Sequence, residues 1–188
     1  MNLFRRYKLH VVFFALALLH LYALVSNFPI LRFLTKPLIC LALIYLLFKT
    51  TGLKRDIEKI VAGGLLFGCL GDTFLMLQHQ FVLGLASFLI GHVLFSIAFI
   101  KQSRLKHLGN LKGFFIVAGI LAMFSYYLFA LLQPSLGPLK IPVILYIMVI
   151  SLMAIFAFTR KQRVRYWSFI VTFIAALLFI ISDSILAI

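Results

Sequence analysis

Acidic residues are scarce in this chain: four of its 188 residues are Asp or Glu, against 18 Lys and Arg, so the formal net charge is +14. Cysteine is rarer still, and both residues, Cys40 and Cys69, lie within apolar runs. Their spacing is not typical of a disulfide framework or a zinc site, and no HExxH-type motif accompanies the few acids. We therefore expect no metal and no cofactor, and we interpret both cysteines as packing residues.

Hydrophobic residues, by contrast, make up 64% of the sequence, and the mean hydropathy is +1.16. This composition is too apolar for a soluble domain of this length and predicts a polytopic helical membrane protein. A strong positive charge could also indicate nucleic-acid binding. Here, however, the basic residues separate apolar runs, as expected for loops at an anionic membrane surface. We expect membrane lipids as partners and no nucleic acid.

Seven apolar runs are each long enough to cross a hydrocarbon core of about 30 Å as a helix rising about 1.5 Å per residue. They cover Leu9–Val25, Leu31–Phe48, Ile60–Leu77, Phe81–Ile100, Gly113–Leu132, Ile141–Phe158 and Tyr166–Ile188. A signal peptide is the alternative for the first run, but its length and the lack of a good cleavage site favour a retained helix. The sequence predicts an all-α transmembrane bundle of seven spans in a single domain, residues 1–188.

Lysine and arginine are distributed unevenly between the two ends of these runs. Three occur in the connections expected on one side: Arg32, Lys36 and Lys140. Fifteen occur on the other: Arg5, Arg6, Lys8, Lys49, Lys54, Arg55, Lys59, Lys101, Arg104, Lys106, Lys112, Arg160, Lys161, Arg163 and Arg165. The positive-inside rule then places the amino terminus in the cytoplasm, and we expect a bacterial inner membrane.

Two aspartates, Asp72 and Asp183, lie inside apolar runs. A carboxylate deep in a bilayer costs at least about 2.5 kcal/mol, so it is expected to face a cavity, a partner or a proton path. Gly64 and Gly68 share a helix face with Asp72, since they recur every four residues, and they leave room for a ligand or a close helix. Counted along their helices, both acids fall in the outer half of the membrane. We expect them to meet in a lipid-accessible hollow there; a structural hydrogen bond between helices is the alternative.

Four stretches resemble the YhhN/TMEM86 family of integral membrane lysoplasmalogenases: Thr35-Lys36-Pro37-Leu38, Gly64–Asp72, Phe88-Leu89-Ile90-Gly91-His92 and Ala176–Ala187 with its Ser182-Asp183. They occur in the expected order and span most of the chain. Family members resemble an eight-helix protein whose last helix follows the Ser-Asp motif, whereas this sequence ends at Ile188. The resemblance therefore implies a final helix that is missing here.

The resemblance implies hydrolysis of the vinyl ether bond of a lysoplasmalogen, which releases a fatty aldehyde and glycerophosphoethanolamine or glycerophosphocholine. Such a bond yields to protonation at the carbon beta to oxygen, which gives an oxocarbenium ion that water captures. Paired carboxyl groups perform comparable acid/base work on glycosides. We hypothesise that Asp72 and Asp183 act as this pair, without assigning which is the acid, and that the lysophospholipid is the substrate.

Three further residues are candidates for substrate binding. Lys36 could bind the lipid phosphate or pair with an aspartate, or its side chain could simply extend to the outer interface. His92 could orient water or a headgroup, or pack between helices. Tyr146 could hydrogen-bond the substrate, although tyrosine is common near membrane interfaces. The remaining histidines, His10, His20, His79 and His107, are interpreted as terminal, interfacial or loop residues.

Two other functions also account for acids within the membrane. A small proton-coupled carrier would use them as relay groups, and it predicts substrate flux without an aldehyde product. A non-catalytic membrane scaffold would use them for assembly, and it predicts that asparagine substitutions disturb association instead of turnover.

Overall fold

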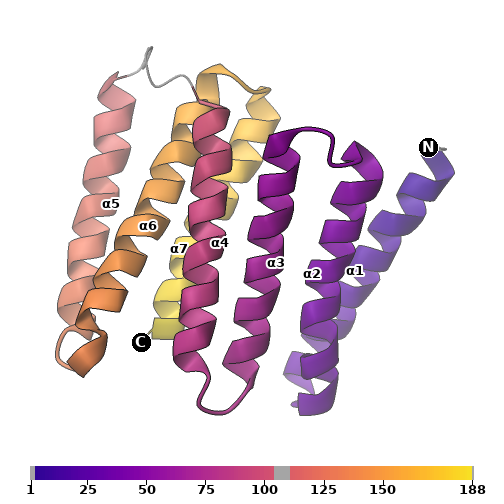
Figure 1. Ribbon diagram of the computed structural model, residues 1–188, viewed down its shortest axis with the longest axis horizontal. Coiled ribbons are helices and arrows are strands. Elements are labelled where there is room, and N and C mark those ends of the chain that lie inside the picture. The colour runs from indigo at the N-terminus through magenta and orange to yellow at the C-terminus, as the bar shows by residue number, and fades with distance from the viewer. Residues whose placement is uncertain (1–2, 104–110, 188) are drawn as a thin grey trace. The chain divides into compact units, whose positions relative to one another are not determined.

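The protein is described by a computed structural model over residues 3–103 and 111–187, and its side chains over residues 8–103 and 112–187. Within these residues the chain forms seven α-helices and two short 3₁₀ turns, and no strand (Figure 1). This confirms the predicted all-α fold with seven helices. Some residues named in the sequence analysis lie outside this description: Arg104, Lys106 and His107. The side chains of Arg5 and Arg6 also lie outside it.

The helices extend the predicted apolar runs by a few residues at most ends. They are α1 (Leu3–Val25), α2 (Pro29–Thr51), α3 (Asp56–Met76), α4 (Phe81–Lys101), α5 (Leu111–Leu132), α6 (Lys140–Thr159) and α7 (Tyr166–Ala187). The 3₁₀ turns η2 (Gly137–Leu139) and η3 (Arg160–Gln162) flank α6. A hydropathy pattern finds the apolar part of a helix, whereas polar residues in the first and last turns can continue the backbone hydrogen bonding beyond it.

Six of the helices in the described part of the chain are long and apolar enough to cross a membrane. These candidate spans are Lys8–Val25, Pro29–Thr51, Phe81–Lys101, Lys112–Leu132, Gly137–Gln162 and Tyr166–Ala187. Helix α3 is not among them; it carries three of the four acidic residues of the chain, Asp56, Glu58 and Asp72. That α3 is a seventh span stays a prediction.

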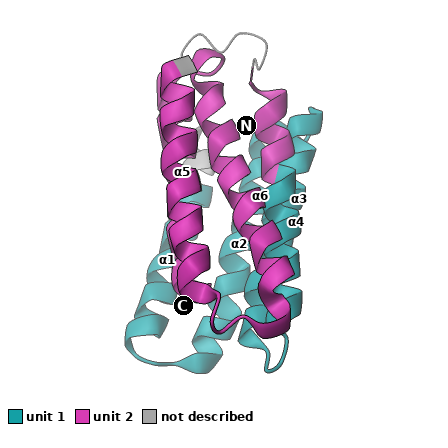
Figure 2. Cartoon of the chain, turned by 90° about the vertical axis from the view of Figure 1, so that its left-hand side faces the viewer, with its two compact units in different colours: residues 1–94 teal, residues 95–188 magenta. Residues whose placement is uncertain are grey.

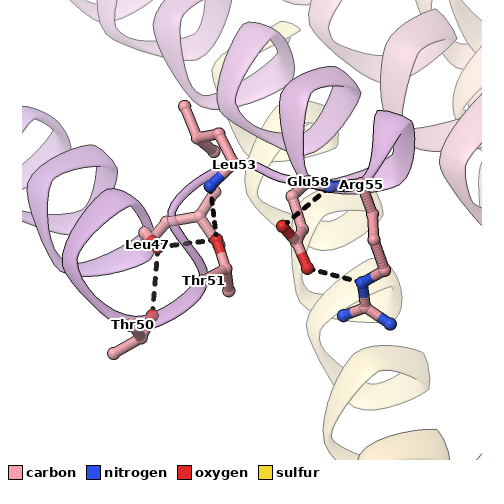
Figure 3. Close-up of polar contacts among 6 residues, drawn as sticks. All are labelled: Leu47, Thr50, Thr51, Leu53, Arg55 and Glu58. Atoms are coloured by element: carbon pink, nitrogen blue, oxygen red, sulfur yellow. Dashed lines mark hydrogen bonds and ion pairs between the residues drawn. The ribbon is translucent and has the colours of Figure 1, made fainter.

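The connection between α2 and α3 is fixed by local hydrogen bonds (Figure 3). Gly52 ends α2 in the left-handed region at φ +68°, which glycine adopts without steric cost. The Glu58 carboxylate accepts the Arg55 backbone N–H at 3.2 Å and its Nε–H at 2.6 Å, which caps the first turn of α3. Although it lies in a polar connection, the Glu58 side chain is only 8% exposed. The hydrogen bond from Arg55 lowers the pKa of Glu58.

The chain folds into two compact units, residues 1–94 and 95–188, with the boundary inside α4 (Figure 2). In unit 1, α2 packs against both α1 and α3. In unit 2, α6 packs against both α5 and α7, as Figure 1 also shows. The single domain expected over residues 1–188 stays a prediction.

Unit 2 has an apolar core between α5 and α6, formed by Leu128, Leu132, Val143 and Ile147. One hydrogen bond of 2.9 Å between the hydroxyl groups of Ser125 and Ser151 joins the same two helices. Such a bond gives each hydroxyl group one partner in surroundings that offer few others.

Candidate functional site

Helices α2 and α3 bring Lys36 and Asp72 together in unit 1. The Lys36 Nζ lies 2.7 Å from Asp72 Oδ1, and the two side chains are 35% and 21% exposed. An ion pair at this distance is charge-assisted and strong when it is partly removed from water. Lys36 therefore does not simply extend away from the protein: its ammonium is held by the Asp72 carboxylate that the sequence singled out.

The residue before Lys36 extends this polar cluster to α1. Thr35, which is 2% exposed, donates its hydroxyl hydrogen to the Leu31 carbonyl at 2.7 Å. Its oxygen also lies 2.8 Å from His20 Nδ1. Because the only hydroxyl hydrogen is already donated, Thr35 must accept from His20, so Nδ1 carries a hydrogen. In a neutral His20 the other ring nitrogen, Nε2, is then a hydrogen-bond acceptor.

Helices α3 and α4 approach each other through glycines. A Cβ atom on Gly91 would lie 3.2 Å from the Gly64 carbonyl oxygen. A Cβ atom on Gly71 would lie 2.8 Å from the ring of Phe88, which in turn stacks on His92 with 6.4 Å between ring centroids. The His92 side chain is therefore buried in α4, with 2% of the residue exposed. Its predicted role in binding water or a headgroup stays a prediction.

Gly68 differs from Gly63 and Gly71 of the same helix. A Cβ atom built on it would meet nothing within 4 Å. Residues four apart lie on the same helix face, so the open position at Gly68 is next to Asp72 along α3. Gly91 and Gly71 thus allow α3 and α4 to pack closely, whereas Gly68 leaves space on the face that carries the acid.

The second aspartate is held in unit 2 by α6. The Tyr146 hydroxyl donates to Asp183 Oδ2 at 2.5 Å, and Tyr146 is 8% exposed. The next residue, Ser184, is buried and donates its hydroxyl to the Ile180 carbonyl of its own helix at 2.6 Å. Tyr146 is thus a partner of the carboxyl group inside the protein, which places it away from the interfacial role common for tyrosine.

Four of the five candidate residues therefore form two pairs, Lys36 with Asp72 and Tyr146 with Asp183. Each pair lies within a single unit. That the two acids meet in one hollow stays a prediction. Among residues 3–103 and 111–187 no group of three His, Cys, Asp or Glu side chains is arranged to hold a metal ion.

His20 is the residue of this cluster that the sequence did not identify. It is half-buried, and it precedes Thr35 by 15 residues on a different helix. A lone histidine in an apolar run has no characteristic spacing to a partner. Its partner is a threonine, a residue that is common in helices and does not by itself indicate a contact. Only the packing of α1 on α2 reveals the contact.

Six long apolar helices define a multi-pass membrane protein, and its helices α3 and α7 carry an ion-paired and a hydrogen-bonded carboxyl group. The chain belongs to the YhhN family, whose model matches residues 31–188. Both aspartates lie in the matched range, whereas His20 precedes it. Neither the curated proteins nor the solved structures contain a match to the chain.

Proposed function

We propose that this protein is a membrane hydrolase that cleaves the vinyl ether bond of lysoplasmalogens. Its membership of the YhhN family, over a range that includes Asp72 and Asp183, is the observation that carries the proposal. The partners of the two acids support it, because each carboxyl group has a polar side chain within hydrogen-bonding distance. We also propose a bacterial inner membrane as its location, with a cytoplasmic amino terminus that the distribution of basic residues supports.

The reaction consumes one water and needs one proton to be delivered and one to be removed. A carboxylic acid protonates the alkenyl carbon beta to the ether oxygen, and the electron pair of the double bond forms the new C–H bond. Water adds to the resulting oxocarbenium carbon and loses a proton to a base. The hemiacetal then collapses to an aldehyde and the free hydroxyl of the glycerophospholipid. General acid and general base catalysis each contribute a rate factor of about 10² to 10⁴.

Asp72 and Asp183 supply the two carboxyl groups for these steps. Their partners differ in charge: an ammonium for Asp72 and a neutral hydroxyl for Asp183. Paired acids in acid/base catalysis need unlike surroundings, so that one can donate a proton while the other accepts one. The Lys36 ammonium is also a cation that an incoming phosphate can approach, since its side chain is 35% exposed.

The test uses the purified full chain in detergent with a 1-alkenyl lysophospholipid, and it measures the aldehyde released. Asp72→Asn and Asp183→Asn should each lower the rate at least about 100-fold, because a carboxamide neither donates nor accepts the proton. Asp56→Asn is the matched control: it makes the same change at an exposed acid of α3 and should keep full activity. A lysolipid with a saturated ether chain should give no aldehyde.

Helix content and a single peak in gel filtration must be unchanged in each variant. Full activity in both the Asp72→Asn and Asp183→Asn proteins would refute the proposed chemistry. If the wild-type protein releases no aldehyde, the proposal also fails. Uptake of a solute by sealed vesicles, driven by a proton gradient and lost in the same variants, would instead indicate the carrier.

A further inference from the structure

Arg160 is a buried cation at the end of unit 2 where α4 and α6 end and α7 begins. It is the first residue of η3, directly after α6, and 5% of it is exposed. Its Nε–H donates to the Gln102 side-chain carbonyl at 2.8 Å. Its guanidinium also lies over the ring of Phe99, with 5.1 Å between Cζ and the ring centroid. These contacts hold the planar group in one orientation.

One nitrogen of this guanidinium has no hydrogen-bond partner among the described residues. Arg160 Nη1 is buried, and no side chain or backbone group of the described residues accepts a hydrogen bond from it. Unit 2 contains one side-chain carboxyl group in its sequence, that of Asp183, which accepts the Tyr146 hydroxyl. Asp183 is near the other end of α7, 17 residues beyond Tyr166 and about 26 Å away along the helix axis.

A buried guanidinium without an anion is costly, and proteins normally pair such a charge. The neighbouring side chains make a protein anion still less available, because Lys101, Lys161, Arg163 and Arg165 are exposed at the same end of the unit. Their positive field attracts anions and repels cations. The planar fork of arginine binds the oxygens of phosphate with two parallel hydrogen bonds.

The start of α7 indicates where in the membrane this end of the unit lies. Tyr166 and Trp167 are 64% and 75% exposed. Exposed tyrosine and tryptophan concentrate at the level of the lipid headgroups, where one side of the ring contacts water and the other hydrocarbon. Lipid phosphates therefore lie at the depth of Arg160.

We propose that Arg160 is the centre of a phosphate-binding site that takes either the phosphate of an anionic phospholipid or a free phosphate ion. The site is independent of Asp72 and of the proposed hydrolysis. Gln102 is half-buried, and rotation of its side chain opens the guanidinium to an incoming oxygen. Phosphate then replaces the neutral Gln102 carbonyl as the acceptor and also satisfies Nη1.

Native mass spectrometry of the full chain in detergent tests this site, with phosphatidylglycerol as the lipid probe and inorganic phosphate as the aqueous probe. Arg160→Gln should weaken binding of the occupying probe at least about tenfold, because both charge and fork are lost. Arg160→Lys should weaken it less, since a point charge remains. Gln102→Ala should bind at least as tightly as wild type. Competition between the two probes shows which source of phosphate the site prefers.

Arg163→Gln is the matched control, because it removes one positive charge from an exposed residue of the same segment. If it weakens binding as much as Arg160→Gln, or if Arg160→Gln binds like wild type, the proposal is refuted. A second measurement applies if Arg160→Gln does not fold. Binding to the native state raises thermal stability, so phosphatidylglycerol or phosphate should raise the unfolding temperature of the wild type and neutral diacylglycerol should not. Equal effects of all three would also refute the proposal.

Discussion

Replacing Gly71 by alanine tests the contact between α3 and α4 beside Asp72. The added Cβ would lie 2.8 to 2.9 Å from three ring carbons of Phe88, including Cγ at the base of the ring. Carbon atoms pack at about 3.5 to 4.0 Å, so the ring must move by roughly 0.7 Å or more. Cγ cannot move that far by rotation of the ring alone. Either Phe88 must change its χ1 rotamer or the helices must shift, and overpacking of this kind costs about 1 to 3 kcal/mol.

Gly68→Ala is the matched control for this prediction. It makes the same change in the same helix, where the new methyl group meets nothing within 4 Å. Both substitutions gain the same helix propensity, about 1 kcal/mol for alanine over glycine. Their difference therefore isolates the clash, and the Gly71→Ala protein should be about 1 to 3 kcal/mol less stable than the Gly68→Ala protein.

Reversible unfolding of the full chain in mixed micelles, followed by circular dichroism, measures this difference. A Phe88→Leu background provides a double-mutant cycle, because the smaller side chain should remove most of the cost of Gly71→Ala. Equal stability of the two alanine variants would refute the close approach of Gly71 to Phe88. An undiminished cost in the Phe88→Leu background would show that the clash is elsewhere.

Two further predictions follow from the polar contacts. Tyr146→Phe removes the hydrogen-bond donor to Asp183 and should lower the rate of aldehyde release about tenfold or more. Tyr126→Phe, at a 76% exposed position, is the control and should not lower the rate. Equal rates in the Tyr146→Phe and wild-type proteins would exclude a role for the Tyr146 hydroxyl. Glu58, whose pKa is lowered in the folded state, stabilises the fold above its ordinary pKa of 4.5, and this contribution disappears as the pH falls through the folded-state pKa. The Glu58→Gln protein should therefore be less stable than wild type at pH 7 and equally stable in acid. Thermal unfolding at both pH values measures this. A difference in unfolding temperature that does not change with pH would contradict the prediction.

The sequence predicted the helices well because apolar runs of membrane length are a strong signal. It predicted their polar ends less well: α3 starts at Asp56, before the expected Ile60, because the hydrogen bonds between Arg55 and Glu58 cap an additional turn. Such a cap depends on side-chain geometry that hydropathy does not encode.

Depth along the helices placed both acids in the same half of the membrane, and each acid contacts another candidate residue: Asp72 contacts Lys36, and Asp183 contacts Tyr146. The contact between His20 and Thr35 was not predictable, since it depends on the rotation of α1 about its own axis. The boundary between the two units falls within α4, where no change of composition marks it.

Lys36 lies in a turn of α2 whose backbone hydrogen bonding is weakened. The Thr35 hydroxyl competes for the Leu31 carbonyl, and Pro37, one residue after Lys36, has no N–H to donate to the preceding turn. A helix bends most easily where such bonds are missing. We expect α2 to bend here. Such a bend would let Lys36 separate from Asp72, contact a large ligand and re-form the ion pair while the rest of the helix keeps its hydrogen bonds.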